Sequence, residues 1–225
     1  MTITRGKVHK YLRMTIDYSY HGKVIFSMID YIGKMLDNIS EEIKGESSTP
    51  AVHHLFEIAE DETKIYQAGT DIFHQFLAQL LYLSKRARPE IHIAVSFLHT
   101  RLRGTDTNDY KNLERVMKYI QGTIDLTLVF SIDKSGNIKW YVDASFSVHK
   151  DIMSHTGGFM TIGTGGAYMK PSKHKLNTKS SNEAKIFGVD YVMTQVICTL
   201  YFLNEQGYMI HNNVKYQDKQ SAKKL

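Results

Sequence analysis

The chain has 225 residues, of which 42% are hydrophobic and 23% charged. This composition excludes general disorder and is typical of a folded chain with one large domain or two small ones. No run approaches the 18 or so uncharged apolar residues of a membrane span, and no basic-then-apolar leader follows Met1, so we expect an intracellular protein without membrane contact. The single cysteine, Cys198, excludes an internal disulfide and a thiolate-rich zinc site.

The net charge of +5 is distributed unevenly along the chain. Residues 1–130 contain 16 Lys and Arg against 16 Asp and Glu, whereas residues 131–225 contain 12 against 7. The whole excess of positive charge therefore lies in the second part. Such a basic part indicates a polyanionic partner such as nucleic acid, although a solvated lysine surface explains it equally well.

The first part of the chain predicts a hairpin followed by helices. Alternating residues at 11–18 and 23–28 predict two strands around a turn, and a short helix follows at 29–36. The acidic, polar stretch at 38–70 has no sustained period and predicts a linker or lid. Apolar residues at helical spacing then predict three packed helices, at 71–84, 91–102 and 109–120.

Residues 131–225 predict an α/β arrangement with a mixed sheet covered by a helix. The predicted elements are a strand at 138–142, a glycine-centred hairpin of 155–162 with 167–170, a long helix at 182–205, a strand at 214–217 and a helix from Lys219. A long crossover helix allows the strands at 138–142 and 214–217 to be parallel neighbours.

Three carboxylates are brought together by this arrangement. Asp143 and Asp218 each end one of the two parallel strands, and would emerge at the same carboxyl edge of the sheet. Glu183 heads a mostly apolar stripe of the long helix and is expected to point inward near that edge. Three converging acids repel one another unless a hard cation such as Mg²⁺ lies between them, and two such ions can catalyse phosphodiester hydrolysis.

Each acid also has an ordinary structural explanation. The sequence Ser-Ser-Asn-Glu at 180–183 fits a capping box, in which Glu183 only satisfies a backbone donor. Asp218 could cap a following helix, and Asp143 could simply end a strand. Lys173, Lys175, Lys179 and Ser180 precede the long helix and could hold a phosphate backbone or form a solvated loop. The histidines, including His53 and His54, show no metal-ligand spacing.

Four separated motifs resemble the ribonuclease H domain of copia-type LTR retrotransposon polyproteins. They are WYVDASF at 140–146, SHTGG at 154–158, KLNTKSSNEA at 175–184 and YQDKQSA at 216–222. Upstream, QLLYL at 79–83, RPEI at 88–91 and KYIQGT at 118–123 resemble the segment that joins polymerase to ribonuclease in those elements. YLRM at 11–14 resembles the hairpin that steadies the primer.

The resemblance implies a Pol fragment with two domains. Residues 1–130 would form the primer-grip hairpin, thumb and connecting helices, and residues 131–225 an incomplete ribonuclease H-like domain truncated at its C-terminus. It implies cleavage of the RNA strand of RNA–DNA hybrids by two Mg²⁺ ions, or Mn²⁺ in their place, on Asp143, Glu183 and Asp218. The rest of the Pol polyprotein would be a partner, and the location would be cytoplasmic, in virus-like particles, or nuclear.

The chain also departs from the family pattern. Arg13 stands where glycine is usual, Asn-Glu-Ala-Lys at 182–185 where Thr-Glu-Ala-Glu is usual, and Lys219 where asparagine is usual. The family's polymerase aspartates would lie before Met1, and its fourth ribonuclease carboxylate beyond Leu225. These departures leave a second hypothesis open, in which the protein is a catalytically inactive remnant that binds nucleic acid or serves as a connecting scaffold.

Overall fold

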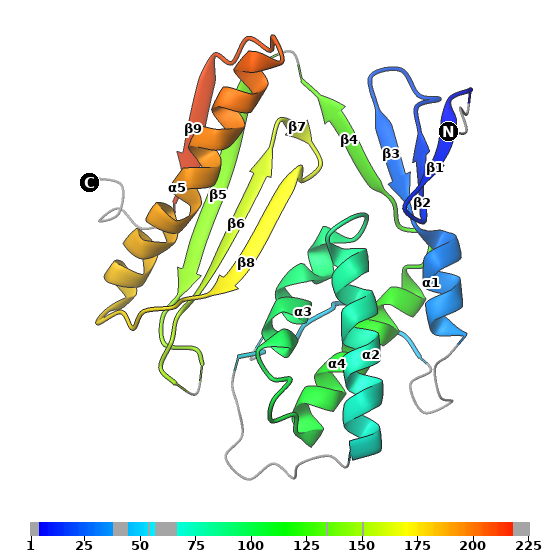
Figure 1. Ribbon diagram of the computed structural model, residues 1–225, viewed down its shortest axis with the longest axis vertical. Helices are drawn as coiled ribbons and strands as arrows, with labels where there is room; N and C mark the ends of the chain where they lie inside the picture. The colour runs from blue at the N-terminus through cyan, green and yellow to red at the C-terminus, as the bar shows by residue number, and fades with distance from the viewer. Residues whose placement is uncertain are drawn as a thin grey trace. The chain divides into compact units, whose positions relative to one another are not determined.

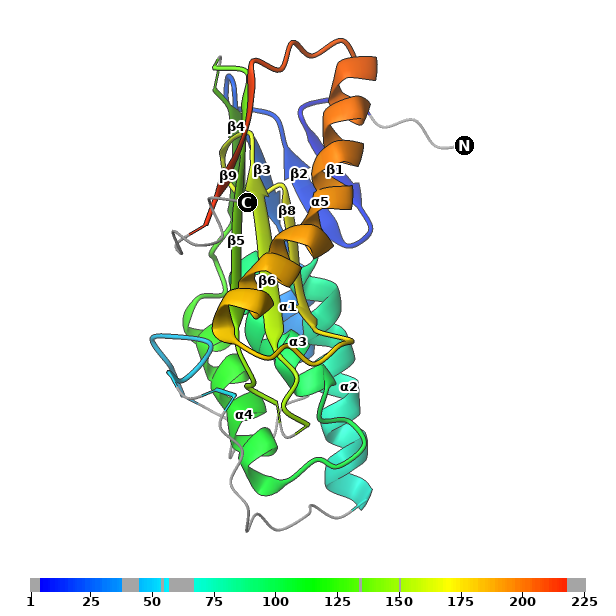
Figure 2. The ribbon, with the colours of Figure 1, turned by 90° about the vertical axis from the view of Figure 1, so that its left-hand side faces the viewer.

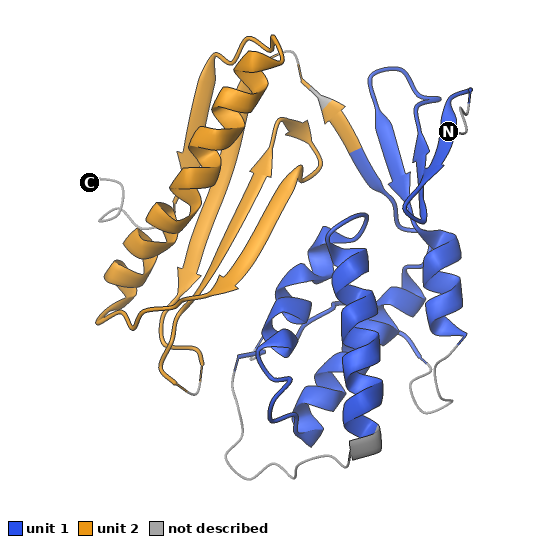
Figure 3. Ribbon diagram, in the orientation of Figure 1, with its two compact units in different colours: residues 1–129 blue, residues 130–225 orange. Residues whose placement is uncertain are grey.

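The structure, a computed structural model, consists of two compact units, residues 1–129 and residues 130–225 (Figure 3). The residues it describes are 5–37, 45–53, 55–56, 67–133, 135–149 and 151–217. The mixture of helices with two sheets confirms the α/β content expected from the sequence. Part of the predicted linker or lid at 38–70 lies outside the described residues. Of the part that is described, residues 67–70 are helical and Leu55 is buried in the core of the first unit, so the prediction of a linker was wrong there.

The first unit opens with an antiparallel three-stranded meander (Figure 1). Its strands are β1 (Val8–Tyr11), β2 (Met14–Asp17) and β3 (Val24–Ser27). The prediction of one unbroken strand at 11–18 was wrong, because the chain reverses at Leu12 and Arg13, which both have positive φ angles, of 49° and 63°. The expected turn before β3 is confirmed, with Gly22 at φ 70°.

Helices make up the rest of the first unit. They are α1 (Ile29–Leu36), α2 (Gln67–Ser84), the 3₁₀ helix η2 (Pro89–Ile91), α3 (His92–His99) and α4 (Thr107–Gly122). The short helix at 29–36 is confirmed at both ends, whereas α3 ends three residues earlier than predicted. Leu77, Leu98 and Val116 are fully buried and belong to the same core, so α2, α3 and α4 pack as the predicted helical module.

The second unit is built on a four-stranded sheet with the order β8-β6-β5-β9 (Figure 1). Strand β4 (Leu128–Ile132) begins at the end of the first unit and continues into the second. The further elements of the second unit are β5 (Asn137–Ser145), β6 (His155–Thr161), β7 (Gly163–Thr164), β8 (Tyr168–Lys173), α5 (Ser181–Glu205) and β9 (Asn212–Tyr216). β5, β6 and β8 are antiparallel, and β9 is parallel to β5. The sequence analysis missed β4, which pairs with β7.

Helix α5 packs on one face of this sheet (Figure 2). Trp140 on β5 is fully buried, and Val192 and Val196 on α5 belong to the same core. The buried face of α5 consists of Ala184, Lys185, Gly188, Val192 and Val196. The prediction that the side of α5 headed by Glu183 faces the sheet was therefore wrong, because Glu183, Ile186 and Ile197 are exposed.

The length and composition of α5 are those of a helix able to cross a membrane. The sequence analysis expected no such segment, because it considered only runs without polar residues. Core helices of soluble proteins meet the same criterion but are mostly buried, whereas 17% of this apolar stretch of α5 is buried, with Val192 and Val196 in the core around Trp140.

A glycine allows α5 to approach the sheet closely. A methyl group on Gly188 would lie 2.9 Å from Thr156 Oγ1 and 3.4 Å from the Ala144 side chain. The first of these distances is too short for a side-chain carbon, so a larger residue would push the helix away. Gly188 thereby holds the first turns of α5, including Lys185, against the end of β5.

We predict that Gly188→Val lowers the free energy of unfolding of the second unit by about 2 kcal/mol, because the added atoms overpack the interface between α5 and the sheet. Urea unfolding followed by the fluorescence of Trp140, the one tryptophan of the chain, measures this unit specifically. Gly157→Val is the matched control, since a methyl group on Gly157 has no neighbour within 4 Å. Equal unfolding midpoints for the two variants would contradict the account.

Candidate functional site

Asp143 lies near the end of β5, at the carboxyl edge of the sheet. It pairs in register with Gly157 of β6, and its side chain is 70% exposed. The Ala144 backbone N–H donates to Asp143 Oδ1 at 2.8 Å. The parallel pairing of β5 with β9 is confirmed, and places Tyr216, the last residue of β9, beside Tyr141. Both strands therefore end at the edge where the sequence predicts the acidic site.

Glu183 has the contacts of a helix cap. The Ser180 hydroxyl accepts a hydrogen bond from the Glu183 backbone N–H at 3.1 Å, and Glu183 Oε2 accepts one from the Lys179 backbone N–H at 2.6 Å. The first bond satisfies a backbone donor that the first turn of α5 leaves open, and the second joins Glu183 to the residue just before the cap. The structural explanation considered for the Ser-Ser-Asn-Glu sequence thus accounts for the position of Glu183, and its carboxylate points to solvent instead of toward the sheet.

Lys185 is the residue of α5 that faces Asp143. Its Nζ lies 3.0 Å from Asp143 Oδ1, and only 9% of its side chain is exposed. Sequence reasoning did not select Lys185 as a site residue. The available signal was the departure at this position, where the resembling sequences usually have glutamate.

The described residues do not fit a two-metal site. Asp143 is ion-paired with Lys185, Glu183 caps α5, and Asp218 lies outside the described residues. Within the described part of the chain, no three His, Cys, Asp or Glu side chains are grouped so that they could hold a metal ion. A divalent cation at Asp143 would meet a resident positive charge there.

We predict that Asp143→Asn destabilises the second unit by about 1 kcal/mol, because it removes the carboxylate beside a poorly solvated ammonium group. The effect is kept small by the exposure of Asp143. Trp140 fluorescence during urea unfolding is the measurement, and Asp190→Asn on the exposed side of α5 is the control. If Asp143 were instead one of several repelling carboxylates, its replacement would stabilise the metal-free protein.

The basic residues before α5 differ in how they are engaged. Lys173 Nζ lies 2.6 Å from Asp151 Oδ2, and the Ser180 hydroxyl is used by the helix cap. The side chains of Lys175 and Lys179 are exposed. Of the four residues predicted to bind nucleic acid, Lys175 and Lys179 therefore present their charge most directly to solvent.

Three histidines gather at the same end of the sheet. The rings of His149 and His155 are 3.1 Å apart between Nε2 and Nδ1, and His174 Nε2 is hydrogen-bonded to the hydroxyl of Thr156. Burial, together with the nearby charges of His149, His174 and Lys173, lowers the pKa of His155 to about 3. Burial also lowers the pKa of His174. These histidines are scattered along the sequence, and their proximity could not be predicted because it depends on pairing between distant strands.

We predict that the second unit loses stability as the pH falls below about 6.5, where His155 becomes protonated in the unfolded chain but stays neutral in the folded one down to about pH 3. The expected loss between pH 7 and pH 5 is about 1–2 kcal/mol. Urea unfolding at several pH values measures it. His155→Gln should make the free energy of unfolding depend less on pH, and His174 should account for the dependence that remains. His21→Gln, at an exposed position, should leave the pH dependence unchanged. A flat profile for the unsubstituted protein would refute this assignment.

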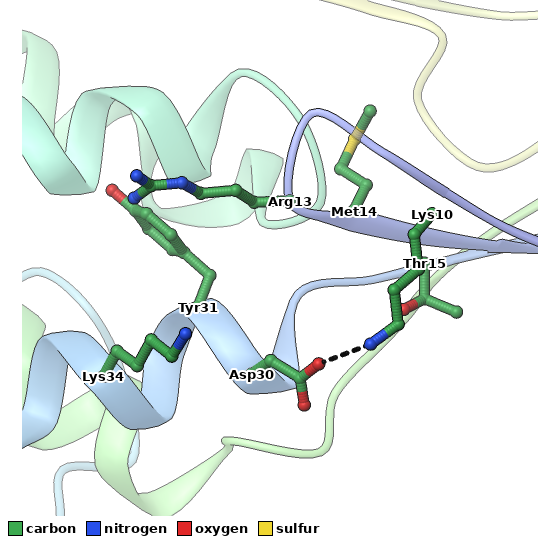
Figure 4. A pocket seen from close by; sticks show the side chains of 7 residues that line it. All are labelled: Lys10, Arg13, Met14, Thr15, Asp30, Tyr31 and Lys34. Atoms are coloured by element: carbon green, nitrogen blue, oxygen red, sulfur yellow. Dashed lines mark hydrogen bonds and ion pairs between the residues drawn. The ribbon is translucent and has the colours of Figure 1, made fainter. Parts of the chain in front are cut away.

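A separate basic pocket lies in the first unit, between the β1–β2 turn and α1 (Figure 4). Its volume is about 280 Å³, and it is lined by Lys10, Arg13, Met14, Thr15, Asp30, Tyr31 and Lys34. Lys10 is paired with Asp30 at 3.0 Å, and the Arg13 guanidinium lies 5.8 Å from the centre of the Tyr31 ring. The φ of 63° at Arg13 explains why glycine suits this position. That this hairpin contacts a primer stays a prediction of the resemblance.

Proteins of transposons are among the known proteins that this chain is similar to. The chain is 28% identical over 172 residues to the putative transposon Ty5-1 protein YCL074W of Saccharomyces cerevisiae; this match covers 75% of the chain and 54% of the relative. It is 25% identical over 206 residues to the retrovirus-related Pol polyprotein from transposon TNT 1-94 of Nicotiana tabacum, covering 89% of the chain and 15% of that polyprotein. The chain thus spans about half of the first relative and a small part of the second. No family model and no solved structure matches it.

Proposed function

Because the chain is related to the Pol polyproteins of copia-type retrotransposons, we propose that its second unit is a ribonuclease H-like domain that binds RNA–DNA hybrids. The observation that carries this proposal is the strand arrangement at one end of the sheet. Lys173 pairs in register with His155, and His155 with Ser145, so the ends of β8 and β5 lie in one row. The lysines between β8 and α5 therefore flank the edge that carries Asp143.

Charge supports nucleic acid as the ligand. The net charge of +5 lies within residues 131–225, and Lys175 and Lys179 extend from this edge into solvent. Lysines that contact phosphates supply affinity without reading sequence. Discrimination of an RNA–DNA hybrid from duplex DNA would come from contacts to the 2′-hydroxyl groups of the RNA strand.

We propose the first unit as the connecting part of the same machinery. Its helical core contains a buried arginine, Arg88, which is 1% exposed. Arg88 donates a hydrogen bond to the Thr123 carbonyl at 2.8 Å and forms an ion pair with Glu90 at 2.5 Å. These contacts connect the start of η2 to the end of α4. A rigid helical module of this kind suits a structural role beside the rest of a Pol polyprotein, which is the proposed protein partner.

Hydrolysis of the RNA strand is the second candidate function. The parallel pairing of β5 with β9 favours it, because it brings Asp143 to the edge at which Asp218 follows β9 in the sequence. With Glu183 these are the residues proposed to hold Mg²⁺ or Mn²⁺. The contacts of Asp143 with Lys185 and of Glu183 with the helix cap favour binding without cleavage.

Binding to a labelled RNA–DNA hybrid, measured by fluorescence anisotropy over a range of salt concentrations, tests the proposal. We predict that affinity falls steeply with salt, and that Lys175→Ala with Lys179→Ala weakens binding and reduces the salt slope by about 2, one for each lost phosphate contact. Lys85→Ala with Lys111→Ala, which removes two exposed lysines of the first unit outside the hairpin, is the matched control.

Two results would count against this proposal. Affinity that does not change with salt would exclude phosphate contacts as its source, and equal losses in the two double variants would exclude the lysines before α5 as the contact surface. Adding Mg²⁺ to the same mixture distinguishes the two candidate functions. Shortening of the RNA strand that Asp143→Asn abolishes would establish hydrolysis, and intact RNA would establish binding only.

A further inference from the structure

The position of Lys185 is fixed by the packing of α5. Lys185 lies on the buried face of the helix, three residues before Gly188, where the helix makes its closest approach to Thr156 and Ala144. With 9% of its side chain exposed, Lys185 has little freedom to swing into water. Its ammonium group is therefore held at the end of β5 by the same contacts that hold the helix on the sheet.

The ammonium group occupies the place beside Asp143 that a metal ion would need. Asp143 Oδ1 contacts both Lys185 Nζ, at 3.0 Å, and the Ala144 N–H, at 2.8 Å. A divalent ion bound to this carboxylate would lie within a few ångströms of the lysine charge, and the two positive charges would repel each other. A cation attached to the chain also has a far higher local concentration than a free ion.

We infer that Lys185 is a built-in counter-ion that takes the place of a divalent metal at Asp143 and prevents metal binding there. This inference rests on the proposed ribonuclease H-like function of the second unit and deepens it, because it makes the domain one that binds its hybrid without metal-dependent cleavage. Lys185 acts through Asp143, whose charge it neutralises, and has no proposed contact of its own with the nucleic acid.

The geometry specifies the substitution that would reverse the effect. A glutamate side chain is one bond shorter than a lysine side chain, so Lys185→Glu would leave roughly 4.5 Å between its nearest oxygen and Asp143 Oδ1. Two Mg–O bonds of about 2.1 Å each span nearly this gap. The substitution replaces one positive charge with a negative one and creates a pair of carboxylates that a divalent ion can bridge.

Mn²⁺ binding measured by electron paramagnetic resonance, with no nucleic acid present, tests this inference separately from hybrid binding. We predict that Lys185→Glu binds Mn²⁺ about tenfold or more tightly than the unsubstituted chain, and that Asp143→Asn in the Lys185→Glu background removes the gain. Lys111→Glu makes the same charge change on the exposed side of α4 and should leave Mn²⁺ binding unchanged.

Lys185→Met covers the case in which Lys185→Glu does not fold, because it removes the charge and keeps an apolar stem against the sheet. It should bind Mn²⁺ more tightly than the unsubstituted chain, whereas Lys111→Met should not. Circular dichroism and Trp140 fluorescence identify which variants are folded. The inference is overturned if the unsubstituted chain binds Mn²⁺ as tightly as the folded Lys185 variant, or if the gain survives Asp143→Asn.

Discussion

The ion pair between Asp143 and Lys185 is the interaction on which the chemistry of the second unit depends. Its partners come from β5 and from the first turns of α5, two segments separated by the whole β6–β8 hairpin. The pair is asymmetric, since the carboxylate is mostly exposed and the ammonium group is mostly buried. A buried ammonium group is costly unless it has a negatively charged acceptor. Asp143 supplies that acceptor to Lys185, and Lys185 in turn neutralises the charge of Asp143.

This pair depends in turn on how closely the helix packs. Because Gly188 has no side chain, α5 can lie close to Thr156 and Ala144, and Val192 and Val196 of α5 share a core with Trp140. The buried polar residues at the same end of the sheet, among them His155 and His174, are engaged with their neighbours in this closely packed region. The edge of the sheet is therefore a preorganised surface in which charges are already balanced, which suits binding to a polyanion through the exposed lysines around it.

Much of this fold could be predicted from the sequence, and the failures have physical reasons. Strand β5 shows a clear alternation, and α1 was predicted at both ends because its apolar residues follow the helical period. The length of α5 was predicted well, but its orientation was not. Large apolar residues such as Ile186 and Ile197 also occur on the exposed side of the helix, so periodicity could not identify which face meets the sheet. The tight turn at Leu12 and Arg13 was missed because neither residue favours a positive φ.

The sequence predicted at which edge of the sheet the candidate site lies, but not which side chains meet there. The order of strands and helix correctly brought Asp143 to the carboxyl edge beside the end of β9. Which residue of α5 faces Asp143 depends on helix phase, so the sequence favoured Glu183 where the structure has Lys185. Asp218 lies outside the described residues, and its role stays a prediction. The departure from the family pattern at position 185 was visible in the sequence, but its meaning required the position of the helix.

A crystal structure of the unsubstituted protein grown or soaked in MnCl₂ is the most direct test of the central claim, because anomalous scattering locates manganese independently of the protein atoms. The account predicts no anomalous peak beside Asp143 and a Lys185 ammonium group in contact with its carboxylate. A manganese ion bound to Asp143, with Lys185 turned away from it, would contradict the account.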